Sequence, residues 1–360
     1  MAVVGGGIVG LCAAYALMER GASLRIFETG VPGNGQSGGE SRIFRHAHDD
    51  ARLVRAAAAS RAIYREWSSR LGVEMVSADG AVAIGDSVER RLSILDRVGG
   101  VPARRIDAAE LAERQPLLAG YDGPAMLDDA GGSIRTGATV MALCAALGDA
   151  LVADEVIGLR PRPSGAVEVT AGGGSGEFGA VLVCAGRGTA ALARGLGISP
   201  PVDHGAHVRL TFRVRGRPPA RLACLQDGSG AFGETGVYAA PLPGNREYAV
   251  GLSESVPVRE DGTMIDRDGL AGLAARTRAY AERALPGLDP DPVGARTCWV
   301  TRLPWGSDGV GVWEAEGVHV LVGHNLFKQA PGLGRALAAM ALGEEPTLDM
   351  RPQARLGASA

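Results

Sequence analysis

Ala2-Val3-Val4-Gly5-Gly6-Gly7-Ile8-Val9-Gly10 indicates the fold class more clearly than any other part of the chain. Its first three residues are apolar and predict a short buried strand, and residues 11–20 predict a helix. Gly21 is placed to cap this helix, and residues 24–28 predict a second strand. The turn between the first strand and the helix has the spacing G-x-G-x-x-G. The stretch therefore predicts the strand–helix–strand unit that begins a dinucleotide-binding domain.

Each glycine of this turn has its own physical role. Gly5 permits the tight turn, Gly7 lets a pyrophosphate approach the backbone, and Gly10 lets helix and strand pack closely. The pyrophosphate then meets the free N–H groups and the positive dipole end of the helix. Glu28 ends the second strand 18 positions after Gly10, where its carboxylate can accept hydrogen bonds from a ribose diol. The strand, the helix and the terminal acid follow one another at the expected spacing, and together they predict dinucleotide binding more specifically than the glycine motif alone.

Only one of the 37 basic residues is a lysine, Lys328. An ammonium differs from a guanidinium where a compact point charge, or an amine that can lose its proton, is required. Lys328 lies in the stretch 323–334, just before a predicted helix. An arginine-biased composition could have kept one lysine by chance, but we favour the interpretation that position 328 faces a site.

The composition limits the classes of protein to consider. A length of 360 residues allows one large domain or two interwoven ones, and a net charge of −3 gives no reason to expect a nucleic acid or an anionic membrane as partner. The odd number of scattered cysteines fits neither a disulfide framework nor a zinc site. Polar loop residues explain the cluster His46, His48, Asp49 and Asp50, so we expect no metal. The chain lacks an apolar run of about 18 residues and begins with a strand, so we expect a cytoplasmic protein without a membrane span or signal peptide.

The order of the predicted strands indicates two interwoven domains. Buried strands of the parallel type lie near the start, the middle and the end of the chain, at 2–4, 180–186 and 318–322. Short alternating segments between residues 207 and 253 predict an antiparallel sheet instead. We therefore expect an α/β fold in which a Rossmann-type cofactor domain is interwoven with an α+β substrate domain built on the antiparallel sheet. The expected cofactor domain comprises 1–45, 130–200 and 292–350, and the expected substrate domain comprises 46–129 and 201–291.

Five further stretches, together with the glycine turn, resemble motifs of a known family. They are Gly39-Glu40-Ser41-Arg42-Ile43-Phe44-Arg45-His46-Ala47, residues 129–134, residues 181–186, Thr297-Cys298-Trp299-Val300-Thr301 and residues 323–334. The set resembles the D-amino-acid-oxidase-like flavoprotein superfamily, and within it the group of monomeric sarcosine oxidase and N-methyltryptophan oxidase. The most specific pieces are Arg42-x-x-Arg45-His46 and Phe327-Lys328, because unrelated enzymes share the glycine turn. The resemblance covers most of the chain.

The resemblance implies FAD as cofactor and a small-molecule amine or amino acid as substrate. In such enzymes a hydride leaves the carbon beside the amine nitrogen for the flavin, the imine hydrolyses, and O2 takes the electrons and becomes hydrogen peroxide. The resemblance assigns the substrate carboxylate to Arg45 and Lys328, whose charge-assisted hydrogen bonds would offset its desolvation beside the flavin. An ion pair of Arg45 with Asp49 or Asp50 is the structural alternative.

The resemblance also places residues against the cofactor. Cys298 would attach FAD through a thioether to the methyl carbon of its benzenoid ring, and the alternative is a buried, inert thiol. Arg42 would pack near the flavin ring, and the alternative is a solvated arginine. A helix from Gly332, preceded by Pro331, would point its positive end at the pyrimidine end of the flavin. The implied cofactor contacts are Gly5, Gly7, Ile8, Val9, Gly10, Glu28, Ser41, Arg42, Val156, Ala185, Gly186, Cys298, Lys328, Gly332 and Leu333.

The chain departs from the family pattern at three positions. Ala249 stands where the oxygen-activating lysine is expected, and Ser253 and Asn325 stand where substrate-side histidines are expected. Tyr238 is retained. The resulting catalytic candidates are Arg45, Lys328, Tyr238 and Asn325.

The alanine at position 249 has consequences for the reaction with oxygen. A cation near the flavin would promote that reaction by stabilising superoxide, so we expect slow oxygen reactivity unless Lys328, Arg42 or His324 substitutes. The alternative function is a flavin-dependent dehydrogenase or desaturase that acts on a larger amine metabolite, such as a carrier-bound one, with poor oxygen reactivity. A non-catalytic dinucleotide-binding protein is the third hypothesis.

Overall fold

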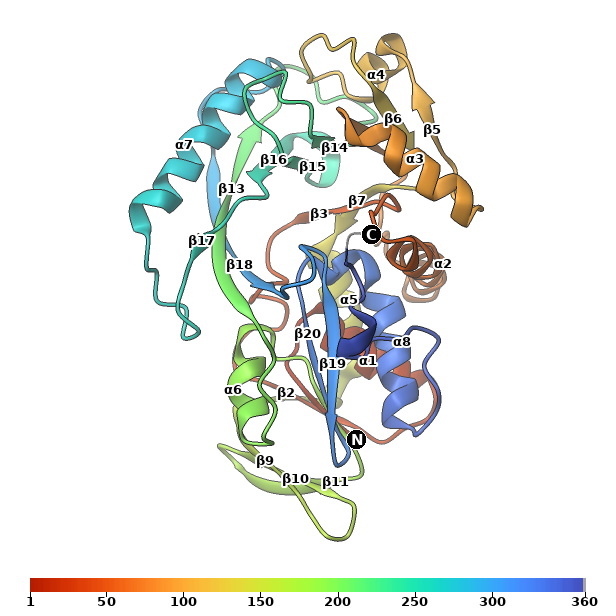
Figure 1. Cartoon of the computed structure of the whole chain (residues 1–360), viewed down its shortest axis with the longest axis vertical. Helices are drawn as coiled ribbons and strands as arrows, with labels where there is room; N and C mark the ends of the chain where they lie inside the picture. The colour runs from red at the N-terminus through yellow and green to blue at the C-terminus, as the bar shows by residue number, and fades with distance from the viewer. Residues whose placement is uncertain (359–360) are drawn as a thin grey trace.

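Six strands from distant parts of the chain form one sheet in the lower half of the molecule (Figure 1). The computed structural model describes residues 1–358. The strand order is β19-β20-β12-β1-β2-β8, and all neighbours pair in parallel except β19 with β20. The strands are β1 (Ala2–Val4), β2 (Arg25–Glu28), β8 (Leu151–Ala153), β12 (Val181–Val183), β19 (Val310–Ala315) and β20 (Val318–Gly323). The start, the middle and the end of the chain therefore meet in this sheet, as the sequence predicts.

Three helices cover one face of the six-stranded sheet. α1 (Ile8–Glu19) packs against α8 (Ala330–Ala341) and α5 (Thr136–Leu147). Apolar residues lie on all sides of α1, which is typical of a helix enclosed in a core. α1 and α8 approach closely because residue 334 is a glycine: a Cβ there would lie 2.6 Å from the backbone carbonyl carbon of Cys12.

A small antiparallel sheet and a short helix cover the opposite face. They are β9 (Val156–Pro161), β10 (Val167–Ala171), β11 (Gly174–Phe178) and α6 (Thr189–Arg194). Val156 and Val167 share an apolar core with Val181 and Val318 of the six-stranded sheet. The sequence patterns do not predict this small sheet.

A nine-stranded sheet forms the upper part of the molecule (Figure 1). Its order is β17-β13-β16-β15-β14-β4-β6-β5, with β18 paired to β13, and only β14 and β4 pair in parallel. α7 packs against β13 and β16, and α3 packs against β4, β5 and β6. These elements are β4 (Ala81–Ile84), α3 (Ser87–Val98), β5 (Ala103–Ile106), α4 (Ala108–Arg114), β6 (Ala125–Asp128), β13 (Asp203–Arg213), β14 (Cys224–Asp227), β15 (Val237–Pro241), β16 (Glu247–Leu252), β17 (Val256–Pro257), α7 (Arg267–Ala284) and β18 (Gly294–Arg302).

Segments between the two large sheets carry or directly adjoin three of the four catalytic candidates, Arg45, Asn325 and Lys328. β3 (Ser41–Phe44) pairs with β7 (Gly132–Arg135) in a short ribbon. α2 (Ala51–Leu71) contacts both α8 and the short 3-10 helix η4 (Leu326–Gln329). Residues 303–309 lead from β18 of the nine-stranded sheet into β19 of the six-stranded sheet. Residues far apart in the sequence therefore meet where the sheets adjoin.

The predicted fold class is confirmed, since a parallel cofactor-type sheet is interwoven with an antiparallel sheet. The sequence also predicts helices at 51–71 and 108–114, which are the bounds of α2 and α4. It predicts a strand at 208–212, which is the inner part of the longer β13. Each large sheet has an apolar core of its own, but the domain boundaries stay a prediction. Among residues 1–358, no helix is long and apolar enough to cross a membrane.

Candidate active site

The glycine turn between β1 and α1 is shaped to receive a bound group. Gly5 has a φ of +105°, and a Cβ there would lie 2.5 Å from the carbonyl oxygen of Cys184. A Cβ at Gly10 would lie 2.0 Å from the carbonyl oxygen of Gly5. Both positions therefore exclude a side chain, as the predicted roles require. Because α1 begins directly after this turn, its first amides provide the donors that suit the pyrophosphate of FAD.

Glu28 lies beside the glycine turn at the end of β2. One carboxylate oxygen accepts a hydrogen bond from the N–H of Gly6 at 2.7 Å, and the other accepts from the N–H of Gly30 at 2.9 Å. These bonds orient the carboxylate and leave lone pairs for a ribose diol. The N–H of Ile8 donates to Oγ of Ser37 at 2.9 Å, so this predicted cofactor contact is shared with a side chain of the protein.

Among the other predicted cofactor contacts, Ala185 and Gly186 lie close to the glycine turn, whereas Val156 lies in the core of the small antiparallel sheet. Ala185 and Gly186 follow β12, and a Cβ at Gly186 would lie 2.6 Å from Oε1 of Gln36. Gln36 donates from Nε2 to Oγ1 of Thr301 at 3.1 Å, so its side chain lies between Gly186 and β18. Val156 instead packs in the core of the small antiparallel sheet, with 7% of its surface exposed.

Cys298 lies in the middle of β18, directly opposite His207 of β13, and is 8% exposed. Nε2 of His207 lies 3.2 Å from the hydroxyl of Tyr238, and the guanidinium of Arg209 lies 5.7 Å from the centre of the Tyr238 ring. Burial lowers the pKa of His207 to about 3, and the neighbouring imidazole of His324 contributes to this shift. The His207 ring is therefore neutral at pH 7.

Arg42 is anchored next to this group. It donates from Nη1 to the carbonyl oxygen of Ser41 at 2.9 Å and from Nη2 to the carbonyl oxygen of Gly38. Its guanidinium lies 5.9 Å from the centre of the Phe327 ring. Burial lowers the pKa of Arg42 to about 10, with the charge of Arg209 as the second cause. Arg42 is therefore not the solvated arginine of the alternative interpretation.

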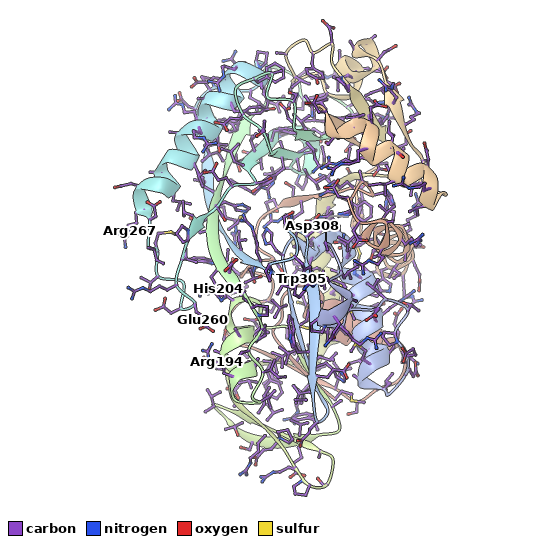
Figure 2. All side chains as sticks on the ribbon, in the orientation of Figure 1. Arg194, His204, Glu260, Arg267, Trp305 and Asp308 are labelled. Atoms are coloured by element: carbon purple, nitrogen blue, oxygen red, sulfur yellow. The ribbon has the colours of Figure 1, made fainter. Side chains whose placement is uncertain are left out.

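Asp308 is the centre of a second polar group, near the middle of the molecule (Figure 2). Its Oδ2 accepts from Nη2 of Arg45 at 3.1 Å and from Nδ1 of His48 at 3.0 Å. Its Oδ1 accepts from Nδ2 of Asn325 at 3.0 Å and lies 3.8 Å from Nζ of Lys328. Three of the four catalytic candidates thus meet around a carboxylate that belongs to the chain itself. We name Arg45, His48, Asp308, Asn325 and Lys328 the Asp308 cluster.

Burial and neighbouring charges set the protonation states in the Asp308 cluster. Burial lowers the pKa of Lys328 to about 8, an effect that Asp308 opposes and Arg45 reinforces. Burial also lowers the pKa of His48 to about 3, with the charge of Arg45 contributing. Burial alone would raise the pKa of Asp308, but Lys328, His48 and Arg45 together hold it well below its usual range. At neutral pH the cluster therefore contains a carboxylate, a neutral imidazole and an ammonium that begins to titrate near pH 8.

The loop that carries Asp308 is held by the C-terminal segment. Nε1 of Trp305 donates to the carbonyl oxygen of Leu356 at 3.0 Å. The N–H of Gly357 donates to Oδ2 of Asp50, the N-cap residue of α2, at 2.8 Å. A Cβ at Gly357 would lie 2.5 Å from the carbonyl oxygen of Asp308. These contacts fix the backbone of the loop beside α2, so the position of Asp308 is built into the fold.

The structure corrects the alternative interpretation of Arg45. Its ion pair is with Asp308, 263 positions away, and not with Asp49 or Asp50. Asp49 lies 2.9 Å from Nη2 of Arg90, and Asp50 caps α2. The sequence suggests the two acids that are nearest along the chain. In the structure, the connection between β18 and β19 places the distant Asp308 beside Arg45 instead.

The two histidines of this segment contact separate carboxylates. Nδ1 of His46 lies 2.9 Å from Oδ2 of Asp128, whereas His48 donates to Asp308. In the part of the chain that the structure describes, no group of three or more His, Cys, Asp or Glu residues could hold a metal ion.

Two of the three positions that depart from the family pattern, Ala249 and Ser253, lie in or beside β16. Ala249 is 5% exposed and pairs with Ala240 of β15 and Thr211 of β13. Ser253 follows β16 and donates from Oγ to the carbonyl oxygen of Gly236 at 2.7 Å. Position 249 is therefore an apolar part of the sheet, and any lysine ammonium near the site comes from Lys328.

The predicted start of the last helix needs a correction. α8 begins at Ala330 rather than at Gly332, with Pro331 in its first turn, where the lack of an N–H has no cost. The N–H of Gly332 donates to Oγ of Ser60 in α2 at 3.2 Å, and Leu333 is fully buried in the core. The amide predicted to face the flavin is thus already hydrogen-bonded to α2.

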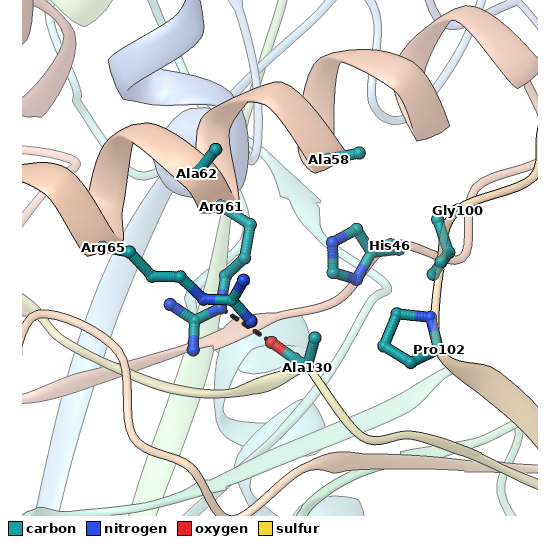
Figure 3. Close-up of a pocket in the computed structure, with 9 residues that line it drawn as sticks. His46, Ala58, Arg61, Ala62, Arg65, Gly100, Pro102 and Ala130 are labelled. Atoms are coloured by element: carbon teal, nitrogen blue, oxygen red, sulfur yellow. Dashed lines mark hydrogen bonds between the residues drawn. The ribbon is translucent and has the colours of Figure 1, made fainter.

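A cavity of about 470 Å³ opens on the side of α2 shown in Figure 3. The N–H at Nε of Arg61 donates to the carbonyl oxygen of Ala130 at 2.8 Å within it. Its lining includes His46, Arg61, Arg65, Pro102 and Ala130. None of the catalytic candidates lines this cavity, so we place the candidate active site between the Asp308 cluster and Cys298.

Sequence reasoning missed two residues of the candidate site. Asp308 lies in Trp305-Gly306-Ser307-Asp308-Gly309, a composition typical of a turn, so nothing in the sequence separates it from a turn-forming aspartate. His207 faces Cys298 only because β13 pairs with β18, a strand that is distant in the sequence. Position 207 could have been found only by predicting that pairing and its register.

Comparison with known families gives a match over most of the chain. The DAO family model, described as FAD dependent oxidoreductase, matches residues 1–340. Glycine oxidase from Geobacillus kaustophilus (strain HTA426) is 27% identical over 381 residues, which cover 98% of this chain and 95% of that protein.

Solved structures share the fold over nearly their whole length. The open form of NikD, an unusual amino acid oxidase essential for nikkomycin biosynthesis, has a TM-score of 0.82 at 22% identity and covers 99% of this chain and 96% of its own. L-proline dehydrogenase from P. horikoshii has a TM-score of 0.82 at 19% identity, with 97% and 94% covered. At these identities the similarity shows the fold alone.

Proposed function

The chain belongs to the DAO family of FAD dependent oxidoreductases, and from that premise we propose that it oxidises the C–N bond of a primary or secondary amine or amino acid to an imine. The family match confirms the resemblance seen in the sequence motifs. FAD, when bound, supplies the acceptor for the hydride that leaves the substrate. Relatives named as a glycine oxidase and an amino acid oxidase support an amino acid as substrate.

The meeting of Arg45 and Lys328 at one point carries the proposal. A guanidinium and an ammonium that both approach the carboxylate of Asp308 have the charge and position to hold a substrate carboxylate. Asn325 adds a neutral donor. Two cations and one anion leave one net positive charge in the Asp308 cluster, which matches a single ligand carboxylate.

The residues beside Cys298 are suited to orient a neutral amine, the form whose lone pair drives hydride loss. Burial lowers the pKa values of His207 and His324 to about 3 and about 4, so both rings are neutral at pH 7. Burial raises the pKa of Tyr238, which keeps its hydroxyl proton. These groups can therefore exchange hydrogen bonds with the amine without repelling it.

We also propose that Cys298 carries FAD covalently. The Cys298 thiol is buried, with 8% of its surface exposed, and it lies near enough to Arg42 to interact with its charge. Forming the thioether would remove one hydrogen from the thiol and one from the methyl carbon, and with them two electrons. Oxygen is the acceptor for those two electrons.

Lys328 is proposed to serve the reaction with oxygen as well as the substrate. Its ammonium is the compact cation that can take over where Ala249 replaces the family's lysine. The apolar setting of Ala249 favours a second candidate function, a dehydrogenase or desaturase on a larger amine metabolite that reduces another acceptor.

An anaerobic amine panel tests the proposed function. We expect at least one amino acid to bleach the absorbance of oxidised flavin near about 450 nm, and peroxide to appear when air is admitted. Bleaching without peroxide would select the dehydrogenase, and no bleaching by any amine would reject both functions.

A further inference from the structure

Asp308 engages the two cations that the proposed function reserves for the substrate. We propose that Asp308 is a specificity-determining residue that competes with ligand carboxylates for Arg45 and Lys328 and so sets the affinity of the site for acids. The inference rests on the proposed function, because it takes these cations to be the carboxylate site.

The hydrogen bonds of Arg45 show the competition directly. Its Nη2 donates to Asp308 at 3.1 Å, and its Nη1 donates to the carbonyl oxygen of Ala47. A guanidinium binds a carboxylate best through two parallel N–H groups. Because both terminal nitrogens are engaged, a ligand carboxylate must displace Asp308 or share Arg45 with it.

The protein holds Asp308 at this point from several sides. Asn325 and His48 each donate to it at 3.0 Å, and His48 in turn faces Nε2 of Gln329 at 2.9 Å. This arrangement places the proton of the neutral His48 ring on Nδ1 and leaves Nε2 as the acceptor. Asp308 is therefore bound as an anion by neutral donors as well as by the two cations.

Charge counting gives the direction of the effect. With Asp308 ionised, Arg45 and Lys328 present one net positive charge to a ligand, and without it they present two. The attraction for a carboxylate therefore rises when Asp308 is neutralised. In the native protein Asp308 therefore lowers the affinity of Arg45 and Lys328 for a ligand carboxylate, and simple acids are poor ligands. The other groups of the substrate must supply additional affinity, so the substrate is an amino acid with further recognised groups.

Acetate titration of the flavin-loaded enzyme tests the inference, because acetate carries the carboxylate without an oxidisable amine. The dissociation constant is read from the shift of the visible flavin spectrum and checked by calorimetry. Asp308→Asn keeps the shape of the side chain, and we expect it to bind acetate about tenfold more tightly than the native protein. The control Asp49→Asn removes an equal charge at an ion pair with Arg90 and should bind acetate as the native protein does.

The outcome that overturns the inference is acetate affinity in Asp308→Asn that is unchanged, weaker or unmeasurable. Adding Lys328→Met to Asp308→Asn should remove the gain, and a gain that persists also overturns it. If Asp308→Asn does not retain flavin, Asp308→Glu replaces it: this variant keeps the charge and should bind acetate no more tightly than the native protein, and tighter binding rejects the inference. Acetate binding needs no turnover, so an unresponsive amine panel would reject the proposed function and leave this result intact.

Discussion

The glycine turn and the Asp308 cluster prepare for a ligand in opposite ways. The turn excludes side chains, so that backbone amides at the start of α1 can meet a pyrophosphate, and its residues are consecutive in the sequence. The cluster gathers charged and polar side chains from the end of β3, from the 303–309 loop and from the segment at η4. The turn can therefore be read from local spacing, whereas the cluster exists only after the two large sheets have come together.

The largest expected effect is at the turn. Gly10→Ala places a Cβ 2.0 Å from the carbonyl oxygen of Gly5, so the start of α1 must shift. We expect the protein to lose its flavin and roughly 3 kcal/mol of unfolding free energy. Flavin absorbance after gel filtration and urea denaturation measure the two losses.

A matched substitution in α7 serves as the control for the turn. Within the described residues, nothing lies within 4 Å of a Cβ at Gly272, so Gly272→Ala should keep the flavin and gain up to about 1 kcal/mol from helix propensity. A Gly10→Ala protein that is as yellow and as stable as this control would show that the close approach in the turn is not required.

Cys298 is proposed to hold FAD by its flavin ring, whereas the glycine turn would hold the same cofactor by its pyrophosphate. Cys298→Ser should still bind FAD through the turn, but all of the flavin should enter the supernatant after acid precipitation. The native protein should keep its yellow colour in the pellet. Yellow pellets from both proteins, or from neither, would contradict the thioether at Cys298.

The cluster predicts a combined defect for Lys328→Met. Loss of the buried ammonium should weaken the binding of a carboxylate substrate by about 100-fold and also slow the reoxidation of the flavin by oxygen. Stopped-flow bleaching and reoxidation rates separate the two steps. Lys328→Arg keeps the charge and should retain more substrate affinity than Lys328→Met. A defect in affinity alone would leave Lys328 with the carboxylate as its single role.

The smallest expected effect is a pH dependence that belongs to the cluster and not to the turn. Burial lowers the pKa of Lys328 from 10.5 to about 8, so its ammonium is fully present below that pH and is lost as the pH rises through it. Asp308 and the neutral His48 do not titrate in this window, because their pKa values lie far below it. Acetate binding should therefore weaken above about pH 8 in the native protein and show no such inflection in Lys328→Arg. The same inflection in both proteins would assign the titration to another group.

The sequence predicts the local features of the molecule and fails where a contact depends on strand pairing. The turn, Glu28 and the full extent of α2 follow from spacing and periodicity, and the meeting of Arg45 with Lys328 follows from the family resemblance. Asp308 could not be predicted, because its role comes from a long connection between two sheets and its local sequence indicates only a turn. The predicted start of α8 lies two residues too late, because the prediction puts Pro331 before the helix, whereas this proline occupies its first turn.

Arg45 and Lys328 are proposed to recognise the carboxylate of an amine substrate beside the flavin. The most direct test compares anaerobic flavin bleaching by a responsive amino acid with bleaching by the amine that lacks its carboxylate. At equal low concentration the amino acid should bleach the flavin about 100-fold faster, and Arg45→Met should abolish most of the difference. Equal rates for the two compounds in the native protein would contradict the claim.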